Sequence, residues 1–199
     1  MIIGVTGGFA SGKSTVAKMV AKALHAELLD ADKIAHDVLE NNDSAQKQVL
    51  AHFGRADRRF LARVVFSDSK KLKVLCDIIH PKVIFEIKNS AKEKLKINQN
   101  AYIVIDAPLL IEAGLTGFCD IVVVVSASTA DICRRAVKHF HMNKNDALKR
   151  IKAQMPISKK KEYADYVIAN NGSVKQLESD VKHLITKIYK EEQDGFRRT

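Results

Sequence analysis

The stretch GVTGGFASGKST, residues 4–15, constrains the fold of this chain more than any other part of it. It holds four of the nine glycines of the chain, and three of them, Gly7, Gly8 and Gly12, fall within six positions. The apolar, β-branched run 1–6 before them is typical of a buried strand. Apolar residues recur at helical spacing over 13–24 after them. The glycines therefore form a turn between a strand and a helix, where something must come very close to the backbone.

The same stretch matches the pattern G-x-x-x-x-G-K-[ST]. In that pattern, successive backbone N–H groups hold phosphate oxygens, and the following helix points its positive end at the same anion. The lysine contacts the β- and γ-phosphates, and the hydroxyl after it ligates Mg²⁺, here Lys13 and Ser14. The residues that we expect to bind nucleotide are Gly7, Gly8, Ala10, Ser11, Gly12, Lys13, Ser14 and Thr15. Ala10 stands where many such loops have glycine, and its methyl group should not block phosphate. The alternative is a glycine-rich turn without a ligand.

Composition and charge narrow the range of partners. The chain has 199 residues and no apolar run that approaches the roughly 20 residues of a membrane span. Its first residues lack the basic lead and the cleavage site of a signal peptide, so we expect a cytoplasmic protein. The net charge of +10 favours polyanions. Because only 159–161 forms a basic run and no RNA-recognition signature occurs, we expect no nucleic acid as partner. We also expect no membrane partner, and a monomer or weak oligomer.

Further strands and helices alternate along the chain. Apolar runs typical of strands lie at 27–30, 102–106, 121–126 and 166–169. Helical spacing dominates 32–98, with breaks expected near 41–43, 54–56 and His80-Pro81, and two more helices are expected at 129–138 and 144–153. This alternation predicts an α/β fold with a mainly parallel sheet. We expect one domain over 1–199, with an inserted helical lobe over 32–98 and a small helical lid at about 129–153.

Two aspartates, Asp30 and Asp32, follow the second expected strand. In α/β sheets, ligands bind beyond the carboxyl ends of the strands. A kinase needs a carboxylate there, to orient the acceptor hydroxyl and accept its proton. The alternative makes Asp32 only the N-cap of a helix that begins at Lys33. Spacing alone leaves both interpretations open.

The whole chain resembles the dephospho-coenzyme A kinases, P-loop enzymes of the last step of coenzyme A synthesis. The stretches that carry the resemblance run in the family's order between residues 6 and 172: TGGFASGKS, DADKIAHDVLE, DRRFLARVVFSD, IIHPKV, APLLIEAGL, RIKAQMP and YADYVIANNG. Many nucleoside kinases share the first stretch, but the combination is far more specific. The resemblance implies a three-layer P-loop NTPase sandwich, ATP and dephospho-coenzyme A as substrates, and Mg²⁺.

The resemblance also implies roles for single residues. Asp32 corresponds to the base that acts on the ribose 3′-hydroxyl, and Lys13 and Arg135 complete the expected catalytic set. Asn170 corresponds to the turn beside the adenine. The other expected substrate contacts are Arg58, His80, Pro108, Leu109, Leu110 and Glu112. By residue type alone, His80 is more typical of a structural histidine, and Arg135 could be a solvated helix arginine.

The sequence differs from the usual family pattern at three places. His139 stands where the family usually has a second lid arginine, four residues after Arg135. The loop Gly54–Asp57 is shorter than is usual in the family. Asp106 ends a hydrophobic strand as a Walker B aspartate does and could hold Mg²⁺ through water, although many family members lack an acid there.

We therefore expect an enzyme that transfers the γ-phosphate of ATP to the ribose 3′-hydroxyl of dephospho-coenzyme A. A different P-loop nucleoside or small-molecule kinase is the nearest alternative. A nucleotide-switched binding module is the alternative from another class. The set DAD, HP and PLL discriminates between these classes, because a switch has no need of it.

Overall fold

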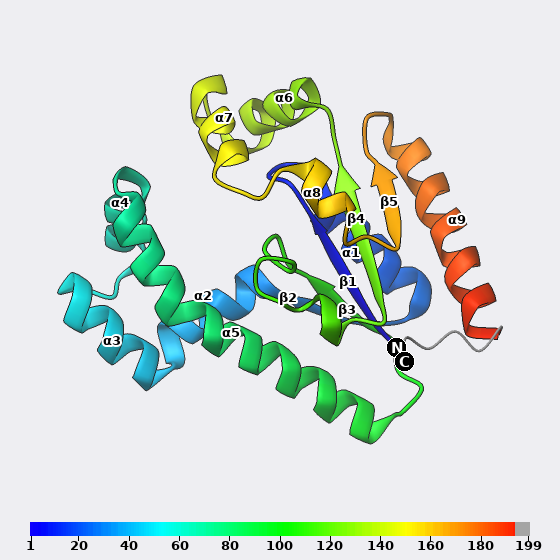
Figure 1. Ribbon diagram of the computed structural model, residues 1–199, viewed down its shortest axis with the longest axis horizontal. Helices are drawn as coiled ribbons and strands as arrows, with labels where there is room; N and C mark the ends of the chain where they lie inside the picture. The colour runs from blue at the N-terminus through cyan, green and yellow to red at the C-terminus, as the bar shows by residue number, and fades with distance from the viewer. Residues whose placement is uncertain (194–199) are drawn as a thin grey trace. The chain divides into compact units, whose positions relative to one another are not determined.

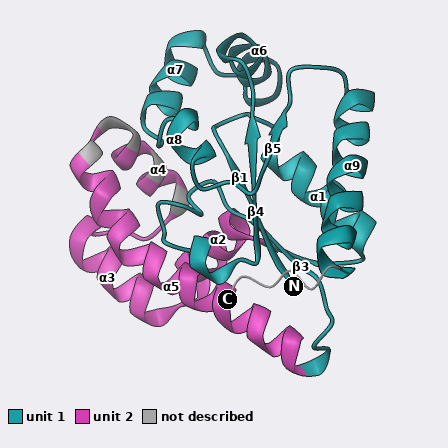
Figure 2. Cartoon of the chain, turned by 45° about the vertical axis from the view of Figure 1, so that its right-hand side comes forward, with its two compact units in different colours: residues 1–29, 97–199 teal, residues 30–96 magenta. Residues whose placement is uncertain are grey.

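The computed structural model describes residues 1–193, apart from the side chains of Arg58, Ala62, Phe66, Ser67 and Ser69. The chain divides into two compact units, which Figure 2 distinguishes by colour. Unit 1 comprises Met1–Leu29 and Ile97–Thr199, and unit 2 comprises Asp30–Lys96.

Unit 1 is built on a five-stranded sheet with the order β2-β3-β1-β4-β5 (Figure 1). Its strands are β1 (Ile2–Gly7), β2 (Glu27–Asp30), β3 (Ile103–Asp106), β4 (Ile121–Ser126) and β5 (Tyr166–Ala169). β1 pairs in parallel with both β3 and β4, and β4 pairs in parallel with β5. Every residue of β1 and β4 is buried, as expected of strands covered on both faces. The predicted α/β class and the five strands are confirmed.

Two helices, α1 (Lys13–Leu24) and α9 (Val174–Gln193), share one hydrophobic core with the sheet. Val16 and Val20 of α1 and Leu184 and Ile188 of α9 are buried in it. Figure 1 shows α9, in orange and red, running beside β5. This core fixes α1, and with α1 the turn that precedes it, against the carboxyl end of β1.

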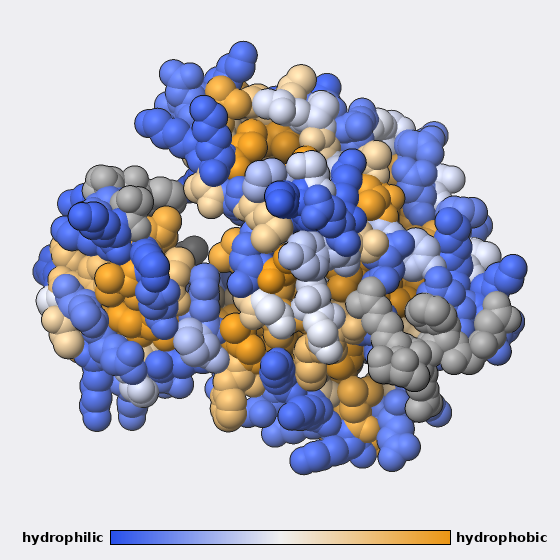
Figure 3. Space-filling view, in the orientation of Figure 1, coloured by the Kyte–Doolittle hydropathy of each residue, from blue (hydrophilic) through white to orange (hydrophobic). Residues whose placement is uncertain are grey.

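The remaining helices of unit 1 are α6 (Thr129–Phe140), α7 (Lys144–Lys152), α8 (Ile157–Lys161) and the short 3₁₀ helix η1 (Thr116–Phe118). α6 and α7 share a second, smaller apolar cluster around Cys133, Ala136 and Ala147. Val137 and Phe140 of α6 are exposed. Figure 3 shows apolar surface among hydrophilic residues in the region of these two helices. These helices lie in the region predicted to form a lid.

Unit 2 consists of α2 (Ala31–Asn41), α3 (Asp43–Phe53), α4 (Arg58–Ser67) and α5 (Ser69–Ile97), whose last residue lies just beyond the unit. The side chain of Asn42 accepts a hydrogen bond from the N–H of Ala45 and so caps α3. Gly54 ends α3 in the left-handed conformation, and Asp57 caps α4. The breaks predicted near 41–43 and 54–56 are therefore confirmed.

The break predicted at His80-Pro81 is wrong, because Pro81 lies inside α5, which is one continuous helix of 29 residues. Proline removes one backbone hydrogen bond and crowds the preceding turn, at a cost of about 3 kcal/mol. Buried aliphatic side chains flank it on the same helix: Ile78, Ile79, Val83 and Ile87. Each contributes roughly 1.5–3 kcal/mol when buried, so packing outweighs the cost of the proline. Within residues 1–193, no helix combines the length and the apolar character that crossing a membrane requires.

Candidate active site

The glycine loop joins β1 to α1 and is crowded at both ends. A Cβ atom on Gly7 would lie 2.3 Å from the carbonyl oxygen of Val125 on the neighbouring strand β4. Gly12 has φ +92°, and a Cβ atom on it would lie 2.2 Å from Nδ2 of Asn170. Both positions therefore require glycine, for close approach and for the left-handed conformation. Two glycines of the sequence pattern therefore lie where a Cβ atom would clash with a neighbouring residue.

Ala10, at the middle of the loop, also adopts a left-handed conformation, with φ +50°. This conformation costs an L-residue with a Cβ atom roughly 1–2 kcal/mol. The loop holds it nonetheless, because contacts on either side fix the backbone. Strain of this kind is stored where a backbone must present its groups to a ligand.

Three polar side chains meet beside the loop. Lys13 donates a hydrogen bond from Nζ to Oγ of Ser14 at 3.2 Å, and its Nζ lies 3.5 Å from Oδ1 of Asp106. Asp106 is the last residue of β3 and pairs in register with Val5 of β1, so the parallel sheet brings it to the loop. The three groups therefore share the carboxyl end of the sheet.

Two buried oxygens beside the loop lack a hydrogen-bond partner among the described residues: Oγ of Ser11 and Oδ1 of Asp106. Only 4% of the surface of Asp106 is exposed, and its contact with Lys13 is an ion pair and not a hydrogen bond. Buried polar atoms of native proteins are almost always bonded to protein, water or an ion. Together with the hydroxyl of Ser14, the carboxylate of Asp106 fits the oxygen ligands of a hydrated Mg²⁺.

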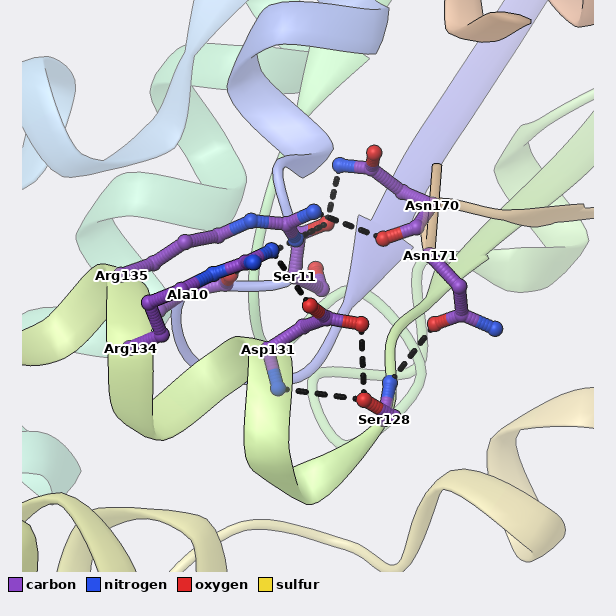
Figure 4. Close-up of polar contacts among 8 residues, drawn as sticks. All are labelled: Ala10, Ser11, Ser128, Asp131, Arg134, Arg135, Asn170 and Asn171. Atoms are coloured by element: carbon purple, nitrogen blue, oxygen red, sulfur yellow. Dashed lines mark hydrogen bonds and ion pairs between the residues drawn. The ribbon is translucent and has the colours of Figure 1, made fainter. Parts of the chain in front are cut away.

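Arg135 and Asn170 donate hydrogen bonds to carbonyl oxygens of the loop (Figure 4). Arg135, on α6, donates from Nη1 to the carbonyl oxygens of Ser11 at 3.1 Å and Ala10 at 3.4 Å, and from Nη2 to the carbonyl oxygen of Asn170 at 2.7 Å. Asn170 donates from Nδ2 to the same Ser11 carbonyl at 2.8 Å. The interpretation of Arg135 as a solvated helix arginine is therefore wrong. Its guanidinium holds the backbone around the strained Ala10.

A second set of contacts fixes α6 itself (Figure 4). Ser128 caps α6 by accepting a hydrogen bond from the N–H of Asp131, and its own N–H donates to Oδ1 of Asn171 at 2.8 Å. Arg134 pairs with the same Asp131. The helix that carries Arg135 is thus tied to the turn after β5, which carries Asn170.

Phe9 connects the loop to α6, to α7 and to the segment after α7. Its N–H donates to Oε1 of Gln154 at 2.8 Å, and its ring lies 5.3 Å from that of Phe140. The guanidinium of Arg150 lies over the same ring, 5.2 Å from its centre. His139 is exposed in the last turn of α6. Sequence reasoning missed Phe9 and Gln154, because the contacts of neither residue are local.

The loop after β3 carries four of the predicted substrate contacts. Leu110 has no exposed surface and packs in the core, whereas Pro108 and Leu109 are partly exposed. The carbonyl oxygen of Pro108 accepts a hydrogen bond from Oγ1 of Thr6 at 3.2 Å. Glu112 accepts a hydrogen bond from the N–H of Met155 and forms an ion pair with a lysine of α8. The loop is therefore held by contacts from several elements.

In unit 2, Asp30 and Asp32 have different positions at the start of α2. Asp30 is the N-cap, and its Oδ1 accepts the N–H groups of Asp32 and Lys33, each at 3.1 Å. Asp32 lies exposed in the first turn of the helix. The interpretation of Asp32 as the N-cap of a helix from Lys33 is therefore wrong, since that role belongs to Asp30.

Two further predicted contacts lie in unit 2. His80 is half-buried in α5, and burial lowers the pKa of its imidazole below the ordinary value of 6.5, while the charge of Asp77 acts in the opposite direction. A neutral imidazole is therefore favoured at this position. Arg58 begins α4, but its side chain lies outside the described part of the structure.

Comparisons of sequence and of structure both find dephospho-CoA kinases among the similar proteins. A family model described as dephospho-CoA kinase matches residues 1–176. The dephospho-CoA kinase of Carboxydothermus hydrogenoformans is 38% identical over 194 residues, with 94% of this chain and 93% of the relative covered. A solved Thermus thermophilus protein is 34% identical with a TM-score of 0.75 and covers 94% of this chain and 97% of its own. The dephospho-CoA kinase from Campylobacter jejuni is 25% identical with a TM-score of 0.68 and covers 96% and 98%.

Proposed function

Since this chain belongs to the dephospho-CoA kinase family, we propose that it transfers the γ-phosphate of ATP to the ribose 3′-hydroxyl of dephospho-coenzyme A. The enzymes of this family are ATP-dependent kinases. The observation that carries the proposal for this chain is the cluster of Lys13, Ser14 and Asp106 beside the glycine loop. A cation, a hydroxyl and a buried carboxylate at that place suit phosphoryl transfer.

The loop and Lys13 bind the phosphates of ATP. The backbone N–H groups between Gly7 and Ser14 supply hydrogen-bond donors, and the N-terminus of α1 adds a positive partial charge. Lys13 adds a full charge at the β- and γ-phosphates. Donors that are fixed in the protein need little reorganisation as charge develops on the transferred group.

Asp32 acts as the general base. Because Asp30 caps α2, helix capping does not account for the carboxylate of Asp32. In the reaction, the ribose 3′-oxygen forms a bond to the γ-phosphorus while the bond from that phosphorus to the β,γ-bridging oxygen breaks. The proton of the hydroxyl goes to Asp32, and ADP leaves with the electron pair of the broken bond.

Mg²⁺ belongs to the proposal because the residues beside the loop fit it. Ser14 would bind the ion directly and Asp106 through water, as is usual for an ion that keeps much of its hydration shell. When bound, Mg²⁺ neutralises charge on the β- and γ-phosphates. An Asp106→Asn variant should then need about 10-fold more Mg²⁺ for half-maximal rate, the lower end of the range for outer-shell changes.

Arg135 and Asn170 complete the nucleotide site. Arginine carries five N–H donors, so the contacts of Arg135 with three carbonyl oxygens leave donors for a phosphate. Its planar, permanently charged group suits the charge that develops on a transferred phosphoryl group. Asn170 lies beside the loop and is proposed to border the adenine.

The acceptor contacts in the proposal are Arg58, His80, Pro108, Leu109, Leu110 and Glu112. The net charge of +10 suits two substrates that each carry several phosphates. We place the enzyme in the cytoplasm, as a monomer or weak oligomer that acts on these small molecules and not on nucleic acid.

Acceptor selectivity tests the proposal. Initial rates of ADP formation are measured with dephospho-coenzyme A, adenosine and uridine at equal concentrations of ATP and Mg²⁺. The proposal expects kcat/KM for dephospho-coenzyme A to exceed the others by about 10⁴-fold, the discrimination reached when a site bonds polar groups that a rival lacks. A nucleoside that matches or exceeds dephospho-coenzyme A would assign the chain to another kinase activity.

A further inference from the structure

Lys160, in the short helix α8, has a fully buried side chain. Lysine is almost never fully buried unless it is paired. Its neighbours Lys159 and Lys161 are exposed, so the run of three lysines is not one solvated surface. A buried ammonium group needs a partner that compensates for the loss of water.

Lys160 finds its partners on the loop after β3. Its Nζ donates to the carbonyl oxygen of Pro108 at 2.6 Å and lies 3.0 Å from Oε1 and 3.1 Å from Oε2 of Glu112. The carbonyl oxygen of Pro108 also accepts from Thr6 of β1, and Glu112 also accepts from the N–H of Met155. Lys160 therefore fixes both ends of the segment 108–112.

The carboxylate of Glu112 is consequently turned toward the protein. A quarter of its side-chain surface remains exposed, while none of the side chain of Lys160 does. Replacing a buried ion pair with apolar residues is often neutral or stabilising, so the pair gives little reason to expect a gain in stability. What the pair does supply is a defined position for Glu112 and for the carbonyl oxygen of Pro108.

The segment 154–160 contacts the nucleotide loop as well. Gln154, at its start, accepts the N–H of Phe9, while Met155 and Lys160 bond the loop after β3. One short stretch of chain thus bonds both the loop proposed for ATP and the loop proposed for the acceptor. The side chains of Gln154 and Lys160 bond different loops, so their effects can be separated by experiment.

We infer that Lys160 is a positioning residue for the acceptor, which acts through Glu112 and the Pro108 carbonyl by holding the segment 108–112 in its productive position. The inference rests on the proposed function of that loop. Gln154 has the corresponding role for the ATP loop through Phe9. Misplacement of a positioning group by about 1 Å can lower a rate by about 100-fold, so the effect is large enough to measure.

The test compares three variants of the full chain. Lys160→Met should raise KM for dephospho-coenzyme A by about 10- to 100-fold and leave KM for ATP within about twofold. Gln154→Ala should raise KM for ATP and leave the acceptor KM within the same limit. Lys159→Met removes an equal charge from the exposed surface of the same helix and should change neither value.

The outcomes separate the alternatives. A Lys160→Met enzyme with an unchanged acceptor KM, or with equal changes in both KM values, overturns the inference and leaves a purely structural lysine. A parent enzyme that forms no coenzyme A overturns the proposed function and this inference with it. If thermal unfolding shows that Lys160→Met does not fold, Lys160→Gln replaces it, because it removes the charge beside Glu112, keeps a polar side chain and leaves every proposed acceptor contact in place. The KM for dephospho-coenzyme A should again rise while the KM for ATP stays within about twofold. An unchanged acceptor KM in this variant would overturn the inference.

Discussion

Asp30 accepts the backbone N–H group of Asp32 through its side chain, at 3.1 Å. The two aspartates of the DAD sequence therefore have separate tasks. Asp30 ends β2 and caps α2, while Asp32 stands in the first turn of the helix. This relationship allows capping and catalysis to be tested by one substitution at each position.

We expect Asp32→Asn to abolish most of the activity without loss of fold. As the proton acceptor, Asp32 should contribute about 10²–10⁴-fold to the rate, the usual range for general acid–base groups. Asp30→Asn should change the rate far less, because asparagine caps helices about as well as aspartate. Steady-state rates and thermal unfolding of both variants are the measurements. Equal, small losses at the two positions would return Asp32 to a structural role.

Lys13 and Asp106 should behave as a coupled pair. Lys13→Ala removes a cation from the phosphates and should lower kcat by about 10²–10³-fold. It also leaves the buried carboxylate of Asp106 without its ion-pair partner, which should cost about 1–3 kcal/mol of folding stability. In the double variant Lys13→Ala/Asp106→Asn, denaturant unfolding should show recovered stability, while turnover stays low. Stability that does not recover would show that the two side chains are not coupled.

The sheet and the glycine loop could be predicted because their signals are local. Continuous apolar runs identify strands covered on both faces. Crowding at Gly7 and Gly12 leaves no room for a Cβ atom, so glycine in the sequence already indicates it. The assignment of the cap to Asp30 depends on a helix boundary, which sequence patterns place only to within a few residues. The continuation of α5 through Pro81 depends on packing from residues on either side.

The contacts that hold the loops could not be predicted in this way. Arg135 bonds the carbonyl oxygen of a residue 124 positions away, and Lys160 bonds one 52 positions away. Nothing in the run KKK distinguishes the buried lysine from its exposed neighbours. These contacts depend on where the fold places α6 and α8 beside the loops of the sheet, which local sequence patterns do not determine.

His139→Arg should leave activity intact or raise it, because a guanidinium is permanently charged and offers several planar N–H donors to a phosphoryl group. The reason is the position of His139 in the last turn of α6, four residues after Arg135. Rate profiles against pH for the parent and the variant are the measurement. A strong loss of rate in the variant at every pH would show that His139 has a different role.

His80 should make the protein less stable on acidification. Burial lowers the pKa of His80 in the folded chain, so the unfolded chain binds the proton first as pH falls. The stability that His80 contributes is therefore complete above pH 6.5, the ordinary pKa, and declines as pH falls through the interval below it. Thermal unfolding of the parent and of His80→Gln over this range should show a shallower pH dependence in the variant. Identical slopes would contradict the role of burial at this position.

The position of the phosphate in the product tests the central claim most directly. The parent enzyme is incubated with ATP, Mg²⁺ and dephospho-coenzyme A, the product is analysed by mass and by phosphorus NMR, and Asp32→Asn is the control. We predict a single product with the new phosphate on the ribose 3′-oxygen, identical to coenzyme A and almost absent with Asp32→Asn. Release of ADP without coenzyme A, or a phosphate on a different oxygen, would contradict the account.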